Sequence, residues 1–378
     1  MLLAQGTNRG NKRISGAYGW GAVAAAAIVT LAGGAAAAPA VAAVTPVHPP
    51  TAPSGGYREI DLISDTALKG TLTDPKVVNP WGIALGPTTP LWVANNGSST
   101  ATLYTGANGK QRVSKVPLTL TLPKGPTGQV FNNRAAVNPR DFVVQTGRTR
   151  AAALFLFDSL GGQLAGWTRS TPLGTSAQVK ATVPQAEYTG LAEAHTTFGN
   201  LLFAANMGAA ARVDVFDAKF RKVFSFADPS LKGLRPYNVA VLGGNLYVSF
   251  APPEGSAATP HGAIDVVSLS GHGVRRLVTG GPLSGPWGMV IAPMDWGRFG
   301  GDLLVGNEDG GQINAFDVRT GKFRGTVSDT SGKAIAHDGL WGLAFGNGTF
   351  GTPHSLIFVA GVGEYQHGLI GLIEPVTR

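Results

Sequence analysis

The sequence predicts an all-β fold, a six-bladed β-propeller built from four-stranded antiparallel blades. The main observation is a phrase that recurs six times after residue 78, in which an aromatic residue or Thr, usually followed by Gly, precedes an aliphatic run. The phrase begins at Trp81, Thr127, Thr189, Tyr237, Trp287 and Trp341, with spacings of 46, 62, 48, 50 and 54 residues. Repeats of this length have room for four short strands and are typical of propellers. The 54 Gly, 25 Pro and absence of Cys also indicate many short strands joined by tight turns, without disulfides.

The first 43 residues have the layout of a secretory signal peptide. Arg9, Lys12 and Arg13 precede an uncharged run at 22–38 that is rich in Ala and Gly. Small residues close to position 43 offer cleavage points, so we predict removal of 1–43 and export to the periplasm or the extracellular space, with no stable membrane span remaining. A retained membrane anchor is the alternative, although an Ala-dominated run is weakly apolar for a span.

Residues 44–56 read VTPVHPPTAPSGG and predict a Pro-rich disordered linker, so the propeller domain is expected over 57–378. The segment 1–43 holds three of the 30 basic residues and none of the 22 acidic ones, which leaves 27 against 22 and a net charge of +5. The basic residues are scattered in sequence and form no stripe interleaved with aromatic residues. No nucleic-acid partner is therefore predicted, and a monomer is expected.

Blade five shows the repeat most clearly, with strand-like runs at 286–292, 302–307, 312–317 and 322–327 separated by turn residues. Blade one has the same pattern at 81–85, 91–95, 101–105 and 112–118, and blade four has it at 237–241, 245–250, 263–269 and 274–278. The last repeat has only three runs, at 341–345, 355–360 and 369–373. The lone strand at 57–63 is predicted to complete this sixth blade, which closes the ring and removes the exposed sheet edges.

Topology predicts which face of the ring carries a site. The loops that lead into the first strand of each blade share a face with the loops that join the second and third strands. Polar residues gather there, and loops on a rigid scaffold commonly hold binding residues. The predicted ligand-binding residues are Asn79, Asn95, Asn206 and Asn238.

Carboxylates on the same face predict a metal site. Glu308, Asp309, Asp338 and Glu364 would form an oxygen-rich site suited to calcium. The alternative is a polar hairpin at 306–311 whose Asn and Asp serve turn geometry. No D-x-[DN]-x-[DN]-G loop is present, so the metal site depends on the convergence of these side chains. His337 is the candidate catalytic base, with a structural histidine as the alternative.

Three tryptophans share one repeat position, at Trp81, Trp287 and Trp341, and each is followed by Gly. One interpretation is an aromatic ring around the channel that stacks on a sugar or another flat ligand. The preferred interpretation is packing between neighbouring sheets.

Four stretches carry a resemblance to a known family: NPWGIA at 79–84, LWVANNG at 91–97, ATLY at 101–104 and PTGQVFN at 126–132. Through them the chain, from Tyr57 to its C-terminus, resembles a family of secreted bacterial proteins whose activity is unassigned. The resemblance implies a six-bladed propeller related to the NHL-repeat and gluconolactonase-like groups. The chain departs from the family's pattern in blade two, at 158–162, so no site residue is transferred to that blade.

Two classes of function follow from these observations. The first, which we prefer because propellers commonly serve it, is a binding or scaffold protein that holds a protein, glycan or small molecule at the channel face or the blade rims. The second is a calcium-dependent hydrolase of the lactonase or gluconolactonase type, in which the cation polarises an ester carbonyl and His337 acts as the base. The sequence contains no G-x-S-x-G elbow, P-loop or H-E-x-x-H motif.

Overall fold

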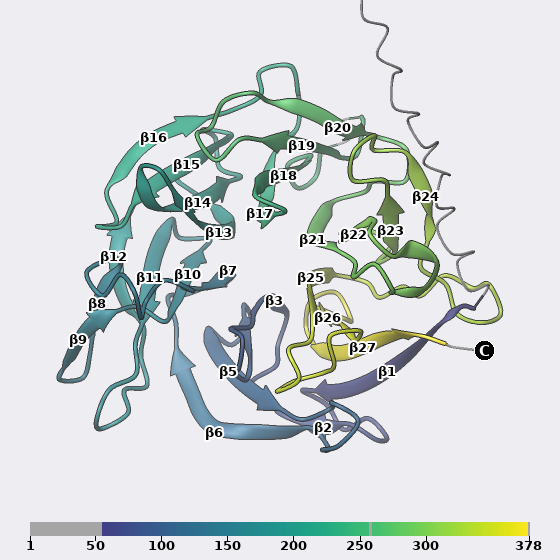
Figure 1. The fold of residues 1–378 in the computed structure, drawn as a ribbon, viewed down its shortest axis with the longest axis horizontal. Coiled ribbons are helices and arrows are strands. Elements are labelled where there is room, and N and C mark those ends of the chain that lie inside the picture. The colour runs from purple at the N-terminus through teal and green to yellow at the C-terminus, as the bar shows by residue number, and fades with distance from the viewer. Residues whose placement is uncertain (1–54, 257–258, 377–378) are drawn as a thin grey trace, which may run out of the picture. The chain divides into compact units, whose positions relative to one another are not determined.

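A computed structural model of the chain describes residues 55–256 and 259–376, and it shows six β-sheets arranged as a ring (Figure 1). The predicted six-bladed propeller of four-stranded antiparallel blades is thereby confirmed. The described residues contain one helical element, the 3-10 turn η1 (Gly297–Phe299), and no helix among them is long and apolar enough to cross a membrane. The predicted signal peptide, and the predicted linker up to residue 54, lie outside the described residues.

Each blade is a meander whose first strand is innermost. Blades one and two contain β3 (Pro80–Ala84), β4 (Leu91–Asn95), β5 (Thr100–Thr105) and β6 (Ser114–Thr121), then β7 (Pro126–Phe131), β10 (Phe155–Ser159), β11 (Gln163–Trp167) and β12 (Gln178–Thr182). Blades three and four contain β13 (Tyr188–Thr196), β14 (Gly199–Asn206), β15 (Arg212–Asp217) and β16 (Lys222–Phe226), then β17 (Arg235–Leu242), β18 (Asn245–Ala251), β19 (Ala263–Val267) and β20 (Arg275–Thr279). Blade five contains β21 (Pro286–Ile291), β22 (Leu303–Asn307), β23 (Ile313–Phe316) and β24 (Phe323–Thr326).

The sixth blade is completed by the N-terminal strand, as predicted. Its chain-terminal strands are β25 (Leu340–Phe345), β26 (Leu356–Ala360) and β27 (Leu369–Pro375), and β1 (Tyr57–Ser64) pairs antiparallel with β27. Tyr57 is opposite Pro375, and its ring lies 4.5 Å from that of Trp296 in the core between blades five and six. The short strand β2 (Leu72–Thr73) adds a parallel fifth strand to this sheet, which the sequence pattern did not predict.

Blade two contains an insertion that explains the long spacing of 62 residues between Thr127 and Thr189. The chain leaves β7, forms the separate hairpin β8 (Val143–Thr146) and β9 (Thr149–Ala152), and returns as the second strand β10. The hairpin projects from the rim beside β11 and β12 (Figure 1). Residues 158–162, where the sequence departs from the family pattern, contain the end of β10 and its turn into β11.

The recurring phrase marks the places where inner strands of neighbouring blades approach most closely. A β-carbon at Gly82 would lie 2.3 Å from the carbonyl oxygen of Thr127, and one at Gly288 would lie 2.4 Å from that of Trp341. Glycine therefore recurs because any side chain there would collide with backbone. Blade four has Asn238 at this position, and its amide donates a 2.7 Å hydrogen bond to a backbone carbonyl of blade five.

Aromatic side chains from four blades meet in the channel. The rings of Trp81 and Trp341 stack with centroids 3.7 Å apart, and Trp287 meets both rings edge-on. Tyr237 contacts Trp341 edge-on at 6.1 Å. Each of these four residues is less than a tenth exposed. The rings pack on one another between blades one, four, five and six, which supports the packing interpretation over a free stacking platform.

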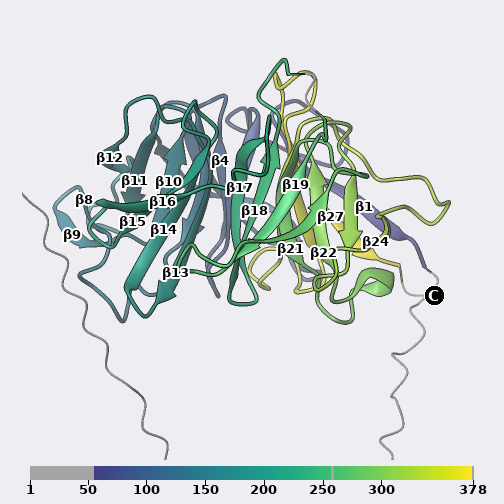
Figure 2. The same cartoon turned by 90° about the horizontal axis from the view of Figure 1, so that it is seen from above.

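The ring has two loop-bearing faces, which are seen edge-on in Figure 2. The upper face carries the loops that lead into each inner strand and the loops between second and third strands. The lower face carries the loops between first and second strands, including η1, and the loops between third and fourth strands. The sequence predicts a site on the upper face.

Candidate functional site

A cavity of about 640 Å³ occupies the channel. Every blade contributes its inner strand to the wall, through residues that include Ile83, Val130, Leu191, Val239, Met289 and Leu343. The lining follows each inner strand from its middle toward its end and includes Pro87 and Asn347 from loops of the lower face. The cavity therefore lies toward the lower face, and Trp287 of the aromatic cluster forms part of its wall. A concave, mostly apolar cavity of this size is typical of small-molecule sites.

Glu193 is the one ionisable side chain among the residues that line the cavity. It projects from β13, where the adjacent residues Ala192 and Ala194 are apolar. Burial raises the pKa of Glu193 to about 7, the charge of Arg134 opposes this effect and the charge of Asp141 adds to it. Its Oε1 atom is buried and has no hydrogen-bond partner in the described part of the chain. A perturbed carboxylate in a cavity is a recognised mark of a functional site.

A second unpaired acceptor lies in the same wall. Gln129 on the neighbouring inner strand β7 uses its amide nitrogen to bond to the carbonyl oxygens of Gly82 and Trp92. Its Oε1 atom is buried without a partner among the described residues. Buried acceptors are normally satisfied, so these two oxygens are exceptions among the buried polar atoms of the described residues.

The four predicted asparagines are buried and bonded to protein groups. Asn79 accepts a 3.0 Å hydrogen bond from the Trp341 indole, and Asn95 donates one of 3.0 Å to Thr102 within its own blade. Asn206 accepts from the backbone of the adjoining loop and donates to Asp214. Asn238 is the member of this set that also lines the channel cavity. These contacts give each amide a structural part in the blade, and ligand binding by the set stays a prediction.

The predicted calcium ligands lie on adjoining upper-face loops of blades five and six. Glu308 accepts hydrogen bonds from the hydroxyls of Tyr237 (2.6 Å) and Tyr365 (2.5 Å), and burial raises its pKa. Asp309 accepts a 3.2 Å hydrogen bond from the Ser284 hydroxyl. Asp338 and Glu364 have exposed side chains. These four residues do not form a group whose ligand atoms all lie within 4.8 Å of one another in the described structure, and the calcium site stays a prediction.

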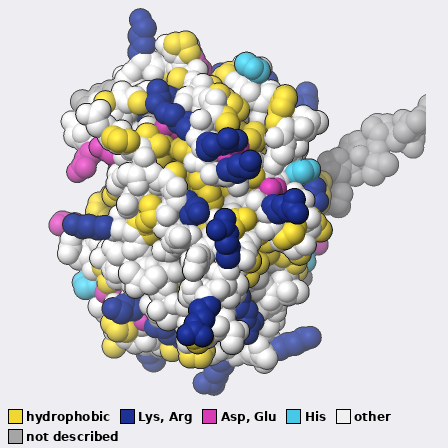
Figure 3. Space-filling model, turned by 90° about the vertical axis from the view of Figure 1, so that its left-hand side faces the viewer, with side chains coloured by type: hydrophobic (Ala, Val, Ile, Leu, Met, Phe, Trp, Pro, Cys, Tyr) yellow, Lys and Arg dark blue, Asp and Glu magenta, His cyan; other side chains and the backbone are white. Residues whose placement is uncertain are grey.

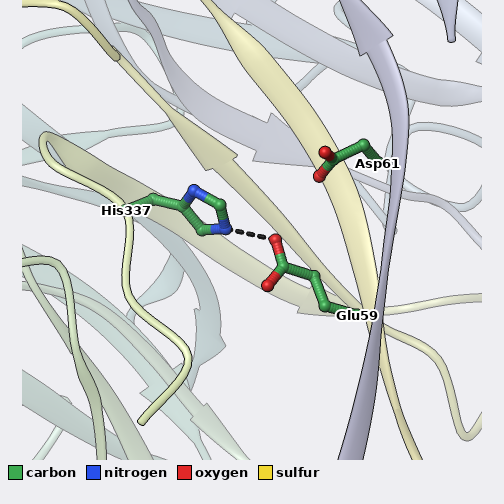
Figure 4. Close-up of side chains that lie close together, drawn as sticks. All are labelled: Glu59, Asp61 and His337. Carbon is green, nitrogen blue, oxygen red and sulfur yellow. Dashed lines mark hydrogen bonds and ion pairs between the residues drawn. The ribbon is translucent and has the colours of Figure 1, made fainter. Parts of the chain in front are cut away.

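His337 belongs to a different cluster, shown in Figure 4. Its Nε2 atom is bonded to Glu59 of β1, and its ring stacks on Phe358 with centroids 4.7 Å apart. Asp61, two residues further along β1, completes a group whose ligand atoms lie within 4.8 Å of one another. Burial raises the pKa of Asp61, and the charge of Glu59 adds to this effect. One imidazole and two carboxylates could hold a divalent cation, but the group lies on the outer strand of blade six, away from the channel.

Sequence reasoning missed Glu193, Gln129, Glu59 and Asp61 as site residues for two different reasons. Glu59 and Asp61 alternate along a strand and so share one face, which is a visible signal. Their partner His337 is 278 residues away, and only ring closure brings it near. Glu193 and Gln129 belong to no motif, and their shared property is that they are polar residues at inner-strand positions near the middle of the channel.

The fold and the cavity together define this chain as a six-bladed β-propeller with a cavity in its channel. No family model matches the chain. It is 30% identical over 334 residues to "Uncharacterized protein R648" of Acanthamoeba polyphaga mimivirus, covering 82% of this chain and 78% of that protein. It is also 30% identical over 335 residues to "Uncharacterized protein L690" of the same virus, covering 82% and 83%. The chain belongs to the family of these viral proteins.

The chain is also similar to solved structures. Kuenenia stuttgartiensis hydrazine synthase matches with a TM-score of 0.48 and 14% identity, over 78% of this chain and 77% of that chain. A streptogramin B lyase structure matches with a TM-score of 0.45 and 12% identity, over 85% of this chain and 97% of that chain.

Proposed function

We propose that this propeller is a binding protein that holds a small molecule in its channel cavity. The observation that carries this proposal is the cavity of about 640 Å³ whose apolar wall contains two unpaired buried acceptors, on Glu193 and Gln129. Small-molecule sites commonly combine an apolar wall with a few placed polar groups that orient the ligand. The inner strands of all six blades form the wall, so the site needs no rearrangement of the scaffold to exist.

The chemistry of the wall selects the kind of ligand. An apolar body would replace water against side chains such as Val239 and Leu343. A protonated amine or another hydrogen-bond donor would pair with the carboxylate of Glu193, the ionisable side chain of the wall. An anionic ligand would place its charge beside the Glu193 carboxylate and would be disfavoured.

The calcium-dependent lactonase is less well supported by this geometry. Its proposed base, His337, is bonded to Glu59 on the outer strand, and its proposed ligands lie on upper-face loops of blades five and six, outside the lining of the cavity. We also propose that the segment 1–43 directs export. The secreted binding protein would then meet its ligand in the periplasm or outside the cell.

The test is a ligand screen against the wild type and two variants. Alkyl and aryl amines, with neutral isosteres of the same size, are screened by thermal shift and by calorimetry on the hits. We expect apolar amines to bind, Glu193→Gln to weaken the amines but not the neutral isosteres, and Ala344→Phe to block both by filling the cavity. Ala344 lines the cavity and is partly exposed.

Glu187→Gln serves as the matched control, because Glu187 is an exposed residue of the upper face. This variant is expected to bind amines as the wild type does. Hits that bind Ala344→Phe as tightly as the wild type would place the ligand outside the channel and refute the proposal.

A further inference from the structure

The two faces of the propeller carry opposite charge. The chain segments that join first to second strands and third to fourth strands, which form the lower face, contain twelve Lys or Arg and four Asp or Glu, a surplus of eight positive charges. The segments of the upper face contain five Lys and ten Asp or Glu, a surplus of five negative charges. This separation is invisible in the sequence, where the two kinds of loop alternate along the chain.

The basic residues of the lower face are exposed. Exposed arginines lie in four lower-face connections of blades two and five: Arg140, Arg148 and Arg150 in the insertion after β7, Arg169 after β11, Arg298 after β21 and Arg319 after β23. Seen from the side of blades two and three, Lys and Arg are spread over the surface while Asp and Glu are few (Figure 3). One of the twelve, Arg221, is compensated by an ion pair of 2.5 Å with Asp217 at the end of β15. A surface with this charge attracts anionic partners.

Three large apolar side chains project from the same face. Val137 is 63% exposed in the loop after β7, Phe198 is 78% exposed in the turn between β13 and β14, and Met294 is 83% exposed in the loop after β21. They are the three most exposed large hydrophobic side chains in the described part of the chain. All three occupy loops between first and second strands, in blades two, three and five.

We propose that the lower face docks on an anionic lipid membrane surface. Basic side chains gain energy near anionic headgroups, and exposed apolar tips gain more by entering the boundary between headgroups and acyl chains. Charge complementarity alone would fit any polyanion. Separated aliphatic and aromatic tips fit a lipid surface better, because a nucleic acid or an acidic glycan offers no continuous apolar layer for Val137 and Met294.

Vesicle binding tests this proposal. The chain from residue 49 onward is used, because 49–378 form one compact unit that contains every sheet and core cluster, and because the Ala-rich segment before it could itself insert into lipid. Co-sedimentation is measured with phosphatidylcholine vesicles and with vesicles that also contain phosphatidylglycerol, at low and at high salt. Binding to the anionic vesicles alone, weakened by salt, is expected.

Two pairs of substitutions separate charge from apolar insertion. Arg140→Glu with Arg298→Glu, and Phe198→Ser with Met294→Ser, should each weaken binding to anionic vesicles by about tenfold or more. The control is Lys124→Glu with Leu160→Ser on the upper face, which should bind as the wild type does. Circular dichroism and thermal unfolding confirm that each variant is folded.

Three outcomes would overturn the proposal: no vesicle binding, equal binding to both kinds of vesicle, or unchanged binding by the tip variant. If heparin or double-stranded DNA retains the wild type and the tip variant equally while vesicles retain neither, the face binds a polyanion instead of a membrane. Glu193→Gln should dock on vesicles normally, so a failure of the channel proposal would leave this test unaffected.

Discussion

Replacing Glu193 with Gln should stabilise the protein at alkaline pH and have little effect on stability at acidic pH. The pKa of this carboxyl is raised from its ordinary 4.5 to about 7 by burial. The folded chain therefore holds a proton that the unfolded chain has released between these two values. The contribution of Glu193 to the free energy of unfolding is therefore most favourable below pH 4.5, becomes less favourable as the pH rises toward 7, and is constant above that range.

The size of the effect follows from the shift. A shift from 4.5 to about 7 corresponds to ~3.5 kcal/mol at most, at ~1.4 kcal/mol per unit. Glu193 is partly exposed, so solvent screens its charge, and we expect a gain of about 1–2 kcal/mol for Glu193→Gln at pH 8. For a domain of this size, each kcal/mol raises the melting temperature by roughly 1–2 °C.

Equilibrium unfolding in urea at pH 4.5 and pH 8 measures this difference. Asp158 and Asp265 also have raised pKa values, to about 7 and about 6, because they are buried, but they are present in both proteins and cancel in the comparison. Glu187→Gln should change stability by less than about 0.5 kcal/mol at either pH. An equal gain at both pH values, or none at pH 8, would refute the assignment of Glu193 as a buried carboxylate without a partner.

Three further predictions concern closure, the aromatic cluster and metal. A chain that begins at Asp65 lacks β1 and leaves β27 as an open edge, so it should lose cooperative thermal unfolding. Addition of a peptide of residues 55–64 should restore cooperative unfolding. Unchanged unfolding without the peptide would show that closure by β1 is dispensable. Trp341→Ala should cost about 3–5 kcal/mol in urea unfolding because Trp341 is only 1% exposed and contacts three other aromatic rings of the channel, while a loss below about 1 kcal/mol would show that the cluster is not a tight core. If the predicted calcium site exists, the purified protein should contain about one equivalent of calcium and a chelator should lower its melting temperature; a metal-free protein with an unchanged melt would contradict that site.

The fold could be predicted from the sequence because its periodic signal is repeated and local. Each blade repeats the same inner-strand phrase, and the missing strand of the last repeat is supplied by the only unassigned strand, at 57–63. The contacts of Gly82 and Gly288 explain the phrase physically, since the ring brings backbone within 2.4 Å of where their β-carbons would be. The β8–β9 hairpin was not predicted because it is inserted between the first and second strands of blade two and shares none of the repeat pattern.

The site was harder to predict because polar residues serve two purposes in this fold. Asn95 and Asn206 have the composition of a binding loop, yet their amides bond within their own blades. Sequence cannot distinguish an amide that satisfies a neighbouring backbone group from one that is free. Glu193 is free because the wall around it is apolar, and that fact depends on strands from all six blades.

The two proposals meet at the lower face. The channel cavity lies toward this face, and Val137, Phe198 and Met294 project from loops of the same face. A propeller docked on an anionic bilayer through these tips would turn the mouth of the cavity toward the interface. Amphipathic cations concentrate at that interface, because their charge is attracted by anionic headgroups and their apolar body enters the acyl boundary. Such molecules have the features that Glu193 and the apolar wall select, so docking would raise the ligand concentration at the mouth, and amines should bind more tightly when anionic vesicles are present than in their absence.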